Sequence, residues 1–393
     1  MRNSTIVFFM AIIAMSAQAA RRVTVKQFDQ SLTEMTESSK TESGILQYLT
    51  QTELTERMST EDLNRWKEKI TDKASSRALT LLADKSTFLN PPAEEIPKNP
   101  PLDKEAQQKL IGSASDYIDR TLSKFPNFFA TEAIMLFENT PPGTDSSGYK
   151  ISFQPIHYES TTNAKVLYRN GKEIMESAAG EIAEDDQVVS PSAGLLSSGQ
   201  FGPVLKTVFA DAGKGKLTWS HWESRIGQNG KAASTVAVFR YSVPRKESHY
   251  RIKVELAGAS KPRSSRPGYH GEIALDPANG TVLRLTLHAD ANEDDSLSVA
   301  NMMIEYGPVE IGGRIYICPT RSIAVVSTNF DSLMYASGAS LESHESPNLQ
   351  HRTEDENHQQ TLLNDVVFER YHLLRSEAKI LTPADINDDG TDP

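Results

Sequence analysis

The residues with the clearest chemical potential form the run Trp219-Ser220-His221-Trp222-Glu223. Side chains alternate between the two faces of a strand, so Trp219, His221 and Glu223 would share one face. A carboxylate beside a histidine orients the ring and raises its pKa, as general acid–base catalysis requires. His221 and Glu223 are therefore candidate catalytic residues, although no nucleophile is identifiable. The alternative is structural, with the tryptophans filling the space between a sheet and a helix.

Two other patterns could hold a metal ion. Asp385, Asn387 and Asp389 have the spacing of the first three oxygen ligands of a calcium loop. The printed sequence ends before the position of the loop's bidentate glutamate, so we expect a frayed acidic tail. His344, His351 and His358 recur every seven residues, but they lie in a polar, proline-containing stretch, where we expect a solvated loop. We predict no bound metal and no cofactor.

The remaining candidates for chemistry are few. Cys318 is the only cysteine, so no intramolecular disulfide can form. It is either a reactive thiol or, as we expect, a half-buried strand residue beside Tyr316. The sequence contains no Gly-x-Ser-x-Gly, phosphate-loop, Gly-x-Gly-x-x-Gly, His-Glu-x-x-His or Cys-x-x-Cys motif. These absences remove the most easily recognised enzyme classes.

Most of the chain has the pattern of an antiparallel sheet. Ile273 and Leu275 alternate up to the turn at residues 276–280, and Leu283, Leu285 and Leu287 alternate beyond it. Such alternation beside Asn-Gly or Gly-Gly predicts hairpins, because these residues accept the positive φ of tight turns. A second hairpin is predicted around Gly312-Gly313. Strands are expected at residues 127–138, 149–158, 165–169, 172–175, 216–223, 235–243, 248–256, 271–275, 282–289, 299–306, 309–311, 314–317, 322–330 and 365–374.

Helices are expected in three places. Residues 21–90 contain few strand formers and predict a small bundle of short helices, one of them capped by Ser59. Residues 103–124 form an amphipathic pattern, and residues 201–212 predict a short helix with an apolar inner face. We expect the helix at 103–124 to pack across the sheet. The apolar positions of these two helices are Leu110, Ala114, Tyr117, Ile118, Leu122, Val204, Leu205, Val208 and Phe209.

The predicted fold class is α+β: a small N-terminal helical segment and a large, curved antiparallel sheet, half-open and barrel-like, with packed helices. The predicted divisions are a signal peptide at 1–19, a helical segment at 20–90, a proline-rich linker at 91–102, an antiparallel sheet domain with a leading helix at 103–380, and a disordered acidic tail at 381–393.

The N-terminus predicts export. Arg2 precedes an apolar run at residues 6–15 and then Ala17-Gln18-Ala19, which is the order of a secretory signal peptide cleaved near Ala19. The apolar run is shorter than the roughly 20 residues that span a bilayer. No later stretch is long enough either. We expect a periplasmic or secreted protein without a transmembrane segment after cleavage.

Charge is unevenly distributed along the 393 residues, whose formal net charge is −11. Residues 342–393 hold twelve acidic and four basic side chains, whereas residues 240–266 hold eight basic and two acidic ones. The basic span could meet anionic lipid headgroups, dock the acidic tail, or be a solvated edge. A nucleic-acid binder would usually be basic overall, so we predict no nucleic-acid partner.

The distinctive runs of the sequence are Leu54–Arg57, Leu82–Asp84, Phe88–Pro92, Phe125–Thr131, Phe201–Pro203, Trp219–Glu223, Tyr269–Ile273 and Tyr306–Gly313. Together they resemble an uncharacterised family of exported proteins from Acidobacteriota, which has no assigned activity and so implies no catalytic residues. Residues 103–380, with a leading helix, a long antiparallel meander and short inserted helices, resemble more loosely the half-open barrel of periplasmic lipoprotein-carrier and lipoprotein-sorting proteins. That resemblance implies an apolar ligand or a lipoprotein.

These observations favour a non-enzymatic, exported cell-envelope protein that binds a lipid, an acylated peptide or a protein partner on the curved sheet. One alternative is an envelope hydrolase that uses His221 and Glu223, and another is a scaffold that binds a partner through its N-terminal helices. The aromatic residues expected to line or brace the ligand face are Phe128, Phe129, Phe153, Trp219, Trp222, Phe239 and Tyr241.

Overall fold

The structure is a computed structural model, and it divides into two compact units, Met1–Pro92 and Ala93–Pro393. The predicted signal peptide, the three spaced histidines and the calcium-like tail lie outside the described residues. The structure describes residues 20–38, 41–122, 124–140, 143–144, 149–176, 182–183, 194–195, 200–225, 234–255, 263–290, 297–329 and 359–374.

The first unit consists of helices around its own apolar core. Phe28, Leu32 and Leu79 are fully buried there, and Trp66 packs edge-on against Phe28 at a centroid distance of 6.5 Å. Ser59 caps α3 as predicted, since its Oγ accepts a hydrogen bond from the Asp62 amide at 3.1 Å. The elements are β1 (Arg21–Val23), α1 (Val25–Glu37), α2 (Glu42–Thr50), β2 (Thr52–Leu54), α3 (Thr60–Lys69) and α4 (Lys73–Ser86).

The short strands β1 and β2 of this unit were not predicted. They pair in parallel, with Val23 opposite Leu54, and both of these side chains are buried in the unit's core. Three-residue strands are too short to show an alternating pattern. Helix α1 begins immediately after β1 at a capping box, in which Thr24 and Gln27 satisfy each other's backbone amides.

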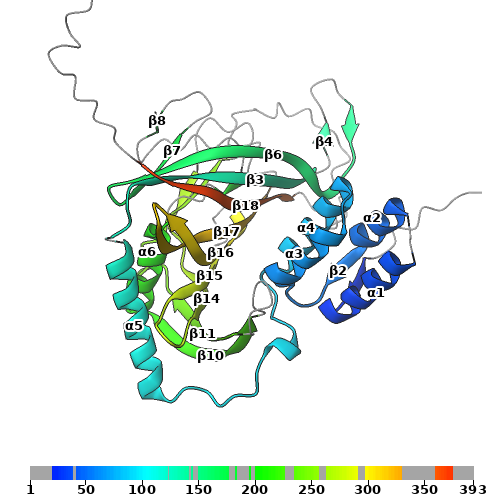
Figure 1. The fold of residues 1–393 in the computed structure, drawn as a ribbon. Helices are drawn as coiled ribbons and strands as arrows, with labels where there is room; N and C mark the ends of the chain where they lie inside the picture. Colours follow the sequence, from blue (N-terminus) through cyan, green and yellow to red (C-terminus); the bar gives the residue numbers. More distant parts are fainter. Residues whose placement is uncertain are drawn as a thin grey trace, which may run out of the picture. The chain divides into compact units, whose positions relative to one another are not determined.

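The second unit is built on one large sheet (Figure 1). All of the paired strands in this sheet are antiparallel, in the order β10-β11-β14-β15-β16-β17-β18-β3-β6-β7-β8, and the sheet does not close. The α+β prediction is confirmed. The helices of this unit and the strands of its large sheet are η1 (Ala93–Glu95), α5 (Lys104–Leu122), β3 (Phe128–Thr140), β6 (Gln154–Arg169), β7 (Lys172–Glu176), β8 (Ile182–Ala183), α6 (Pro203–Ala212), β10 (Lys216–Arg225), β11 (Ser234–Val243), β14 (Tyr269–Leu275), β15 (Val282–Ala289), β16 (Leu297–Ile311), β17 (Arg314–Asn329) and β18 (Gln359–Leu373).

Five further short strands form two small sheets beside the large one. These strands are β4 (Gly143–Thr144), β5 (Lys150–Ile151), β9 (Gly194–Leu195), β12 (Ile252–Glu255) and β13 (Arg263–Ser265), which pair as β4-β5 and β13-β12-β9. The strand predicted at 248–256 is therefore wrong in its length, since only β12 forms. The backbone amide of His249 instead donates a hydrogen bond to the Asp211 carboxylate of α6.

Both predicted hairpins are confirmed. Gly280 closes the β14–β15 turn at φ 77°, and Gly312 and Gly313 close the β16–β17 turn at φ 61° and 81°. The first turn lies against α5, because a Cβ on Gly280 would come within 2.7 Å of the Ala114 backbone nitrogen. Only glycine combines this conformation with so close an approach. The turn thereby fixes where α5 crosses the sheet.

Three long strands were predicted in pieces. Residues 154–169, 297–311 and 314–329 each form one continuous strand. The β16–β17 ladder shifts its register between Glu305 and Tyr306, beside Gly307 and Pro308. A β-bulge or irregularity of this kind lets pairing continue through residues that would end a regular strand. Pairing thus continues through Gly307 and Pro308, where two separate strands were predicted.

Helices α5 and α6 cover the same face of the sheet. Leu110, Ala114 and Ile118 of α5 and Val204, Leu205 and Val208 of α6 are buried in one apolar cluster with residues of β11, β14, β15 and β16. These are positions predicted from the helical periodicity. The cluster fills the space between helices and sheet with side chains from both.

Candidate functional site

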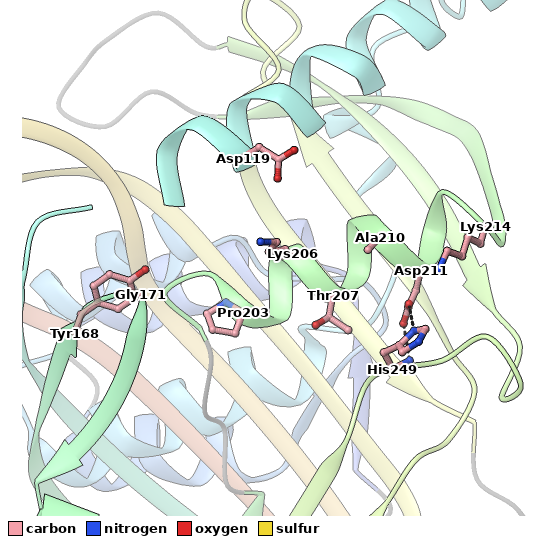
Figure 2. A pocket seen from close by; sticks show the side chains of 10 residues that line it. All are labelled: Asp119, Tyr168, Gly171, Pro203, Lys206, Thr207, Ala210, Asp211, Lys214 and His249. Carbon is pink, nitrogen blue, oxygen red and sulfur yellow. Dashed lines mark hydrogen bonds and ion pairs between the residues drawn. The ribbon is translucent and has the colours of Figure 1, made fainter. Parts of the chain in front are cut away.

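A groove of about 610 Å³ runs along the outer face of α6 (Figure 2). Helix α5 contributes one wall, the end of the β6–β7 hairpin contributes one end, and the segment before β12 contributes the other. The residues that line it are Asp119, Tyr168, Gly171, Pro203, Lys206, Thr207, Ala210, Asp211, Lys214 and His249.

Helix α6 lies between the groove and the apolar core, and its residue types alternate between these two sides at helical spacing. Pro203 occupies the first turn, where its missing amide hydrogen costs nothing. The buried positions Val204, Leu205 and Val208 recur at helical spacing on the inner face. Lys206 and Ala210, four residues apart, line the groove. The helix thus presents an apolar side to the sheet and a mixed side to the groove.

Asp211 anchors one end of the groove. Its carboxylate accepts three hydrogen bonds, from the His249 amide at 2.8 Å, from the His249 ring Nδ1 at 2.6 Å and from the Tyr269 hydroxyl at 2.9 Å. The Asp211 side chain is 1% exposed, whereas that of His249 is 64% exposed. A buried carboxylate that binds Nδ1 fixes the ring's orientation and leaves Nε2 as the ring's second polar atom.

Tyr269, which donates its hydroxyl to Asp211, is itself buried and packed against other rings. Burial is the main cause that raises the pKa of Tyr269 far above its usual value, and the hydrogen bond to Asp211 adds to the effect. The hydroxyl therefore remains a donor at any physiological pH. Its ring also packs against Tyr241 and Tyr250, at centroid distances of 5.8 Å and 5.5 Å. Asp211 is consequently held by a rigid partner from the sheet.

Two ammonium groups lie on the groove wall. Lys206 projects from the middle of α6 and Lys214 follows its last turn (Figure 2). Within the described part of the chain, neither lysine forms an ion pair. Both are exposed, so their charges are available to a ligand while their aliphatic stems add to the apolar lining.

The opposite end of the groove is aromatic. Tyr168 stacks on the fully buried Phe128, with ring centroids 5.1 Å apart and an interplanar angle of 18°. Phe201, just before α6, packs edge-on against Phe128 at 5.4 Å. These rings belong to a second apolar cluster, which also contains Cys318. Cys318 is fully buried rather than half-buried, so the structure corrects that expectation.

The His221–Glu223 pair lies elsewhere, on β10. Nε2 of His221 is 3.6 Å from Oε2 of Glu223, and its Nδ1 is 2.8 Å from the Ser220 hydroxyl. Both carboxylate oxygens of Glu223 are bound by Arg284, at 2.6 Å and 2.8 Å. The carboxylate is therefore already engaged in a buried, bidentate ion pair. Neither His221 nor Glu223 lines the groove.

The predicted face of Trp219 is wrong. The β10–β11 register shifts between Trp219 and His221, which leaves Ser220 without a partner across the ladder. Trp219 therefore lies with Trp222, at a ring distance of 4.9 Å, against the helix-covered cluster. Strict alternation fails here because the irregularity inserts one residue.

The predicted aromatic residues mostly pack in cores, and none of them lines the groove. Phe128, Phe239 and Tyr241 are at most 2% exposed, and Trp222 donates from Nε1 to the Pro100 carbonyl at 2.7 Å. Phe129 lies beside His372, at a centroid distance of 5.0 Å. Phe153 is 49% exposed. The basic span includes an exposed pair, Arg240 with Glu272 at 3.0 Å.

Sequence reasoning missed the groove's polar residues. Lys206, Lys214 and His249 belong to no motif, and Asp211 meets His249 only through folding across 38 residues. The local signal for the groove is the set of polar residues on the outer face of the helix predicted at 201–212. Among the described residues, no group of three or more His, Cys, Asp and Glu could hold a metal ion. No helix in the same ranges is long and apolar enough to cross a membrane.

Comparisons with known proteins give little functional guidance. No family model and no curated protein matches this sequence. Among solved structures, a LolA superfamily protein from Nitrosomonas europaea is similar at 11% sequence identity and a TM-score of 0.29, with 70% of this chain and 97% of that chain covered. So low a TM-score does not identify a function, which must be derived from the groove's own residues.

Proposed function

We propose that this protein is an exported binding protein of the cell envelope, without catalytic activity, that holds a lipid-like molecule in the groove along α6. The observation that carries the proposal is the groove itself. Its volume of about 610 Å³ lies within the range typical of small-molecule sites. Its lining combines mostly apolar surface with a few polar groups at defined places, as such sites usually do.

The packing of α5 and α6 on the sheet favours a ligand in the groove over a ligand on the helix-covered face of the sheet. The helix-bearing face is packed with side chains of α5 and α6, including Leu110, Ala114, Leu205 and Val208. A ligand held directly against that face would have to displace a close-packed core. Four of the aromatic residues expected to line a ligand face pack into this cluster, namely Trp219, Trp222, Phe239 and Tyr241. The outer side of α6 requires no such displacement.

Export is proposed from the N-terminal pattern, with cleavage near Ala19, and the resemblance to exported Acidobacteriota proteins stays a prediction. An oxidising compartment suits the cysteine content, because the single thiol, Cys318, is fully buried. Fractionation of a Gram-negative host that expresses the full chain tests this proposal. We expect a processed protein in the periplasm, and an unprocessed cytoplasmic protein would contradict export.

Ligand binding is tested on that periplasmic protein, purified without detergent. Native mass spectrometry should detect a stoichiometric small molecule, and extraction with organic solvent should release a lipid-like compound. An apo mass that added lipids and fatty acids do not change would rule the proposal out.

A matched pair of variants tests whether the ligand binds in the groove. Ala210→Trp puts a large ring on the groove wall, whereas Gln108→Trp puts the same ring at an exposed position of α5 that does not line the groove. We expect Ala210→Trp to remove the bound molecule and Gln108→Trp to retain it. Equal ligand content in the two variants would show that the molecule binds elsewhere.

Two alternatives stay as predictions. A hydrolase based on His221 and Glu223 would lose ester hydrolysis on His221→Gln, although the engagement of Glu223 by Arg284 disfavours it. A scaffold that works through its N-terminal helices would retain partner capture with residues 20–92 alone. That fragment is a fair reagent because its unit has its own core, from Phe28 to Leu82.

A further inference from the structure

We propose that the ligand of the groove is a single-chain amphiphile with one negative charge. Its anionic head would lie between Lys214 and His249, and its aliphatic chain would extend along α6 toward Tyr168. This inference rests on the proposed function and adds the chemical class and the orientation of the ligand. It starts from the unequal chemistry of the two ends of the groove.

The polar end is formed by residues at and after the C-terminal turn of α6. Lys214, Asp211 and His249 gather there, with the His249 ring tied to Asp211 (Figure 2). Asp211 is itself fixed by the Tyr269 hydroxyl and the His249 amide, so the ring is held in one orientation. An ammonium group and an imidazolium ring held in one orientation form a pair of donors suited to a carboxylate.

The charges at the polar end favour a single negative charge on the ligand. Asp211 is already engaged by His249 and Tyr269, whereas Lys214 forms no ion pair within the described residues. A monoanion compensates the Lys214 ammonium group, whereas a neutral lipid leaves it uncompensated.

The other end is suited to a hydrocarbon chain. Tyr168 and Pro203 lie there, and Thr207 and Ala210 continue the wall toward the polar end (Figure 2). A helix of ten residues such as α6 is about 15 Å long, room for an extended chain of roughly a dozen carbons. The groove therefore fits one acyl chain better than the two chains of a phospholipid.

The anionic head would bind the charged form of the His249 ring. Because Asp211 accepts from Nδ1, Nε2 carries a lone pair in the neutral ring and an N–H in the charged ring. Only the charged ring donates to an anion.

Titration calorimetry on the full periplasmic protein tests the head-group assignment, with decanoate and decanol as probes of equal chain length. We expect decanoate to bind one to one and roughly fivefold or more tightly than decanol, as for an ion pair at a partly exposed site. Lys214→Gln and His249→Gln should each remove most of this difference. Two matched controls should retain it: Lys109→Gln, an exposed cation on α5, and His270→Gln.

His270 is a close control because its Nδ1 also lies 2.8 Å from a carboxylate, that of Asp290, and it does not line the groove.

The outcomes separate the two proposals. Equal binding of decanoate and decanol, or a preference that survives Lys214→Gln and His249→Gln, would overturn the assigned head group while leaving the groove as a binding site. If neither probe binds, the proposed function fails together with this inference.

Discussion

Glu223 of β10 and Arg284 of β15 form a bidentate ion pair that spans the two strands between them, β11 and β14. The two bonds measure 2.6 Å and 2.8 Å, and the side chains are 4% and 10% exposed. Ala274 of β14 lies opposite Arg284 in the ladder, and its small side chain leaves space there. The pair therefore ties the edge strand β10 to the interior of the sheet.

Removal of one partner should be costly. Glu223→Gln removes the bidentate partner of the buried Arg284 guanidinium and leaves its charge to the weaker influence of Glu305 and Glu272, so we expect the sheet unit to lose about 3 kcal/mol of unfolding free energy in urea titrations. The matched control is Glu247→Gln, which breaks an exposed pair with Lys246 and should cost no more than about 1 kcal/mol. Similar losses in the two variants would show that burial does not distinguish these pairs.

Glu132 should make the protein less stable as the pH rises. Burial, assisted by the nearby Glu173, raises the pKa of Glu132 from 4.5 to about 8. The folded state then binds a proton that the unfolded state has lost, so unfolding free energy should fall between these pH values by up to about 1.4 kcal/mol per pH unit. Above about pH 8 the effect should level off.

The variant Glu132→Gln isolates this contribution, because its amide stays neutral at every pH. We expect it to be more stable than the wild type at pH 8 and to show a flatter stability profile between pH 5 and 8. Chemical denaturation at several pH values measures both. A profile with the same slope as that of the wild type would assign the dependence to other groups.

Cys318 should be inert in the folded protein. Burial raises the pKa of its thiol from 9.0 to about 12, and the side chain is fully enclosed in the cluster around Phe128. A thiol-specific chromogenic reagent should therefore react only as the sheet unit unfolds, with a rate that rises across the urea transition. Immediate labelling in native buffer would contradict this burial.

Gly280→Ala should weaken the contact between the sheet and α5. The substitution adds a Cβ within 2.7 Å of the Ala114 backbone nitrogen and also strains a φ of 77°. Gly313→Ala is the control, since its φ is 81° but its Cβ would meet nothing within 4 Å. We expect a cost of about 1 kcal/mol for Gly313→Ala and a clearly larger one for Gly280→Ala, from thermal unfolding. Equal costs would assign the whole effect to backbone conformation.

Local features of the fold could be predicted from the sequence. The turn at Gly280 and the Gly312-Gly313 turn are specified by their own residues, and the buried stripe of α5 by its helical spacing. The irregularity at Ser220 has no such local signature, so the predicted face of Trp219 was wrong. A single unpaired residue reverses the alternation beyond it.

The candidate site could not be predicted, because its contacts are formed by folding rather than by spacing. Asp211 meets Tyr269 across 58 residues, and it belongs to a helix whereas Tyr269 belongs to a strand. The most suggestive motif, His221 with Glu223, proved to include half of a buried ion pair, and its partner Arg284 lies 61 residues away. A sequence pattern shows which groups are available but not which partners will engage them.

The place of β18 has a consequence for how the chain is made. This strand pairs with β17 on one side and with β3 on the other, and the strands of the two flanking groups, β3 to β8 and β10 to β17, share no ladder in the described parts of the sheet. A chain that emerges N-terminus first can therefore pair the strands within each group early, but it cannot join the two groups into one sheet until residues 359–373 have been synthesised.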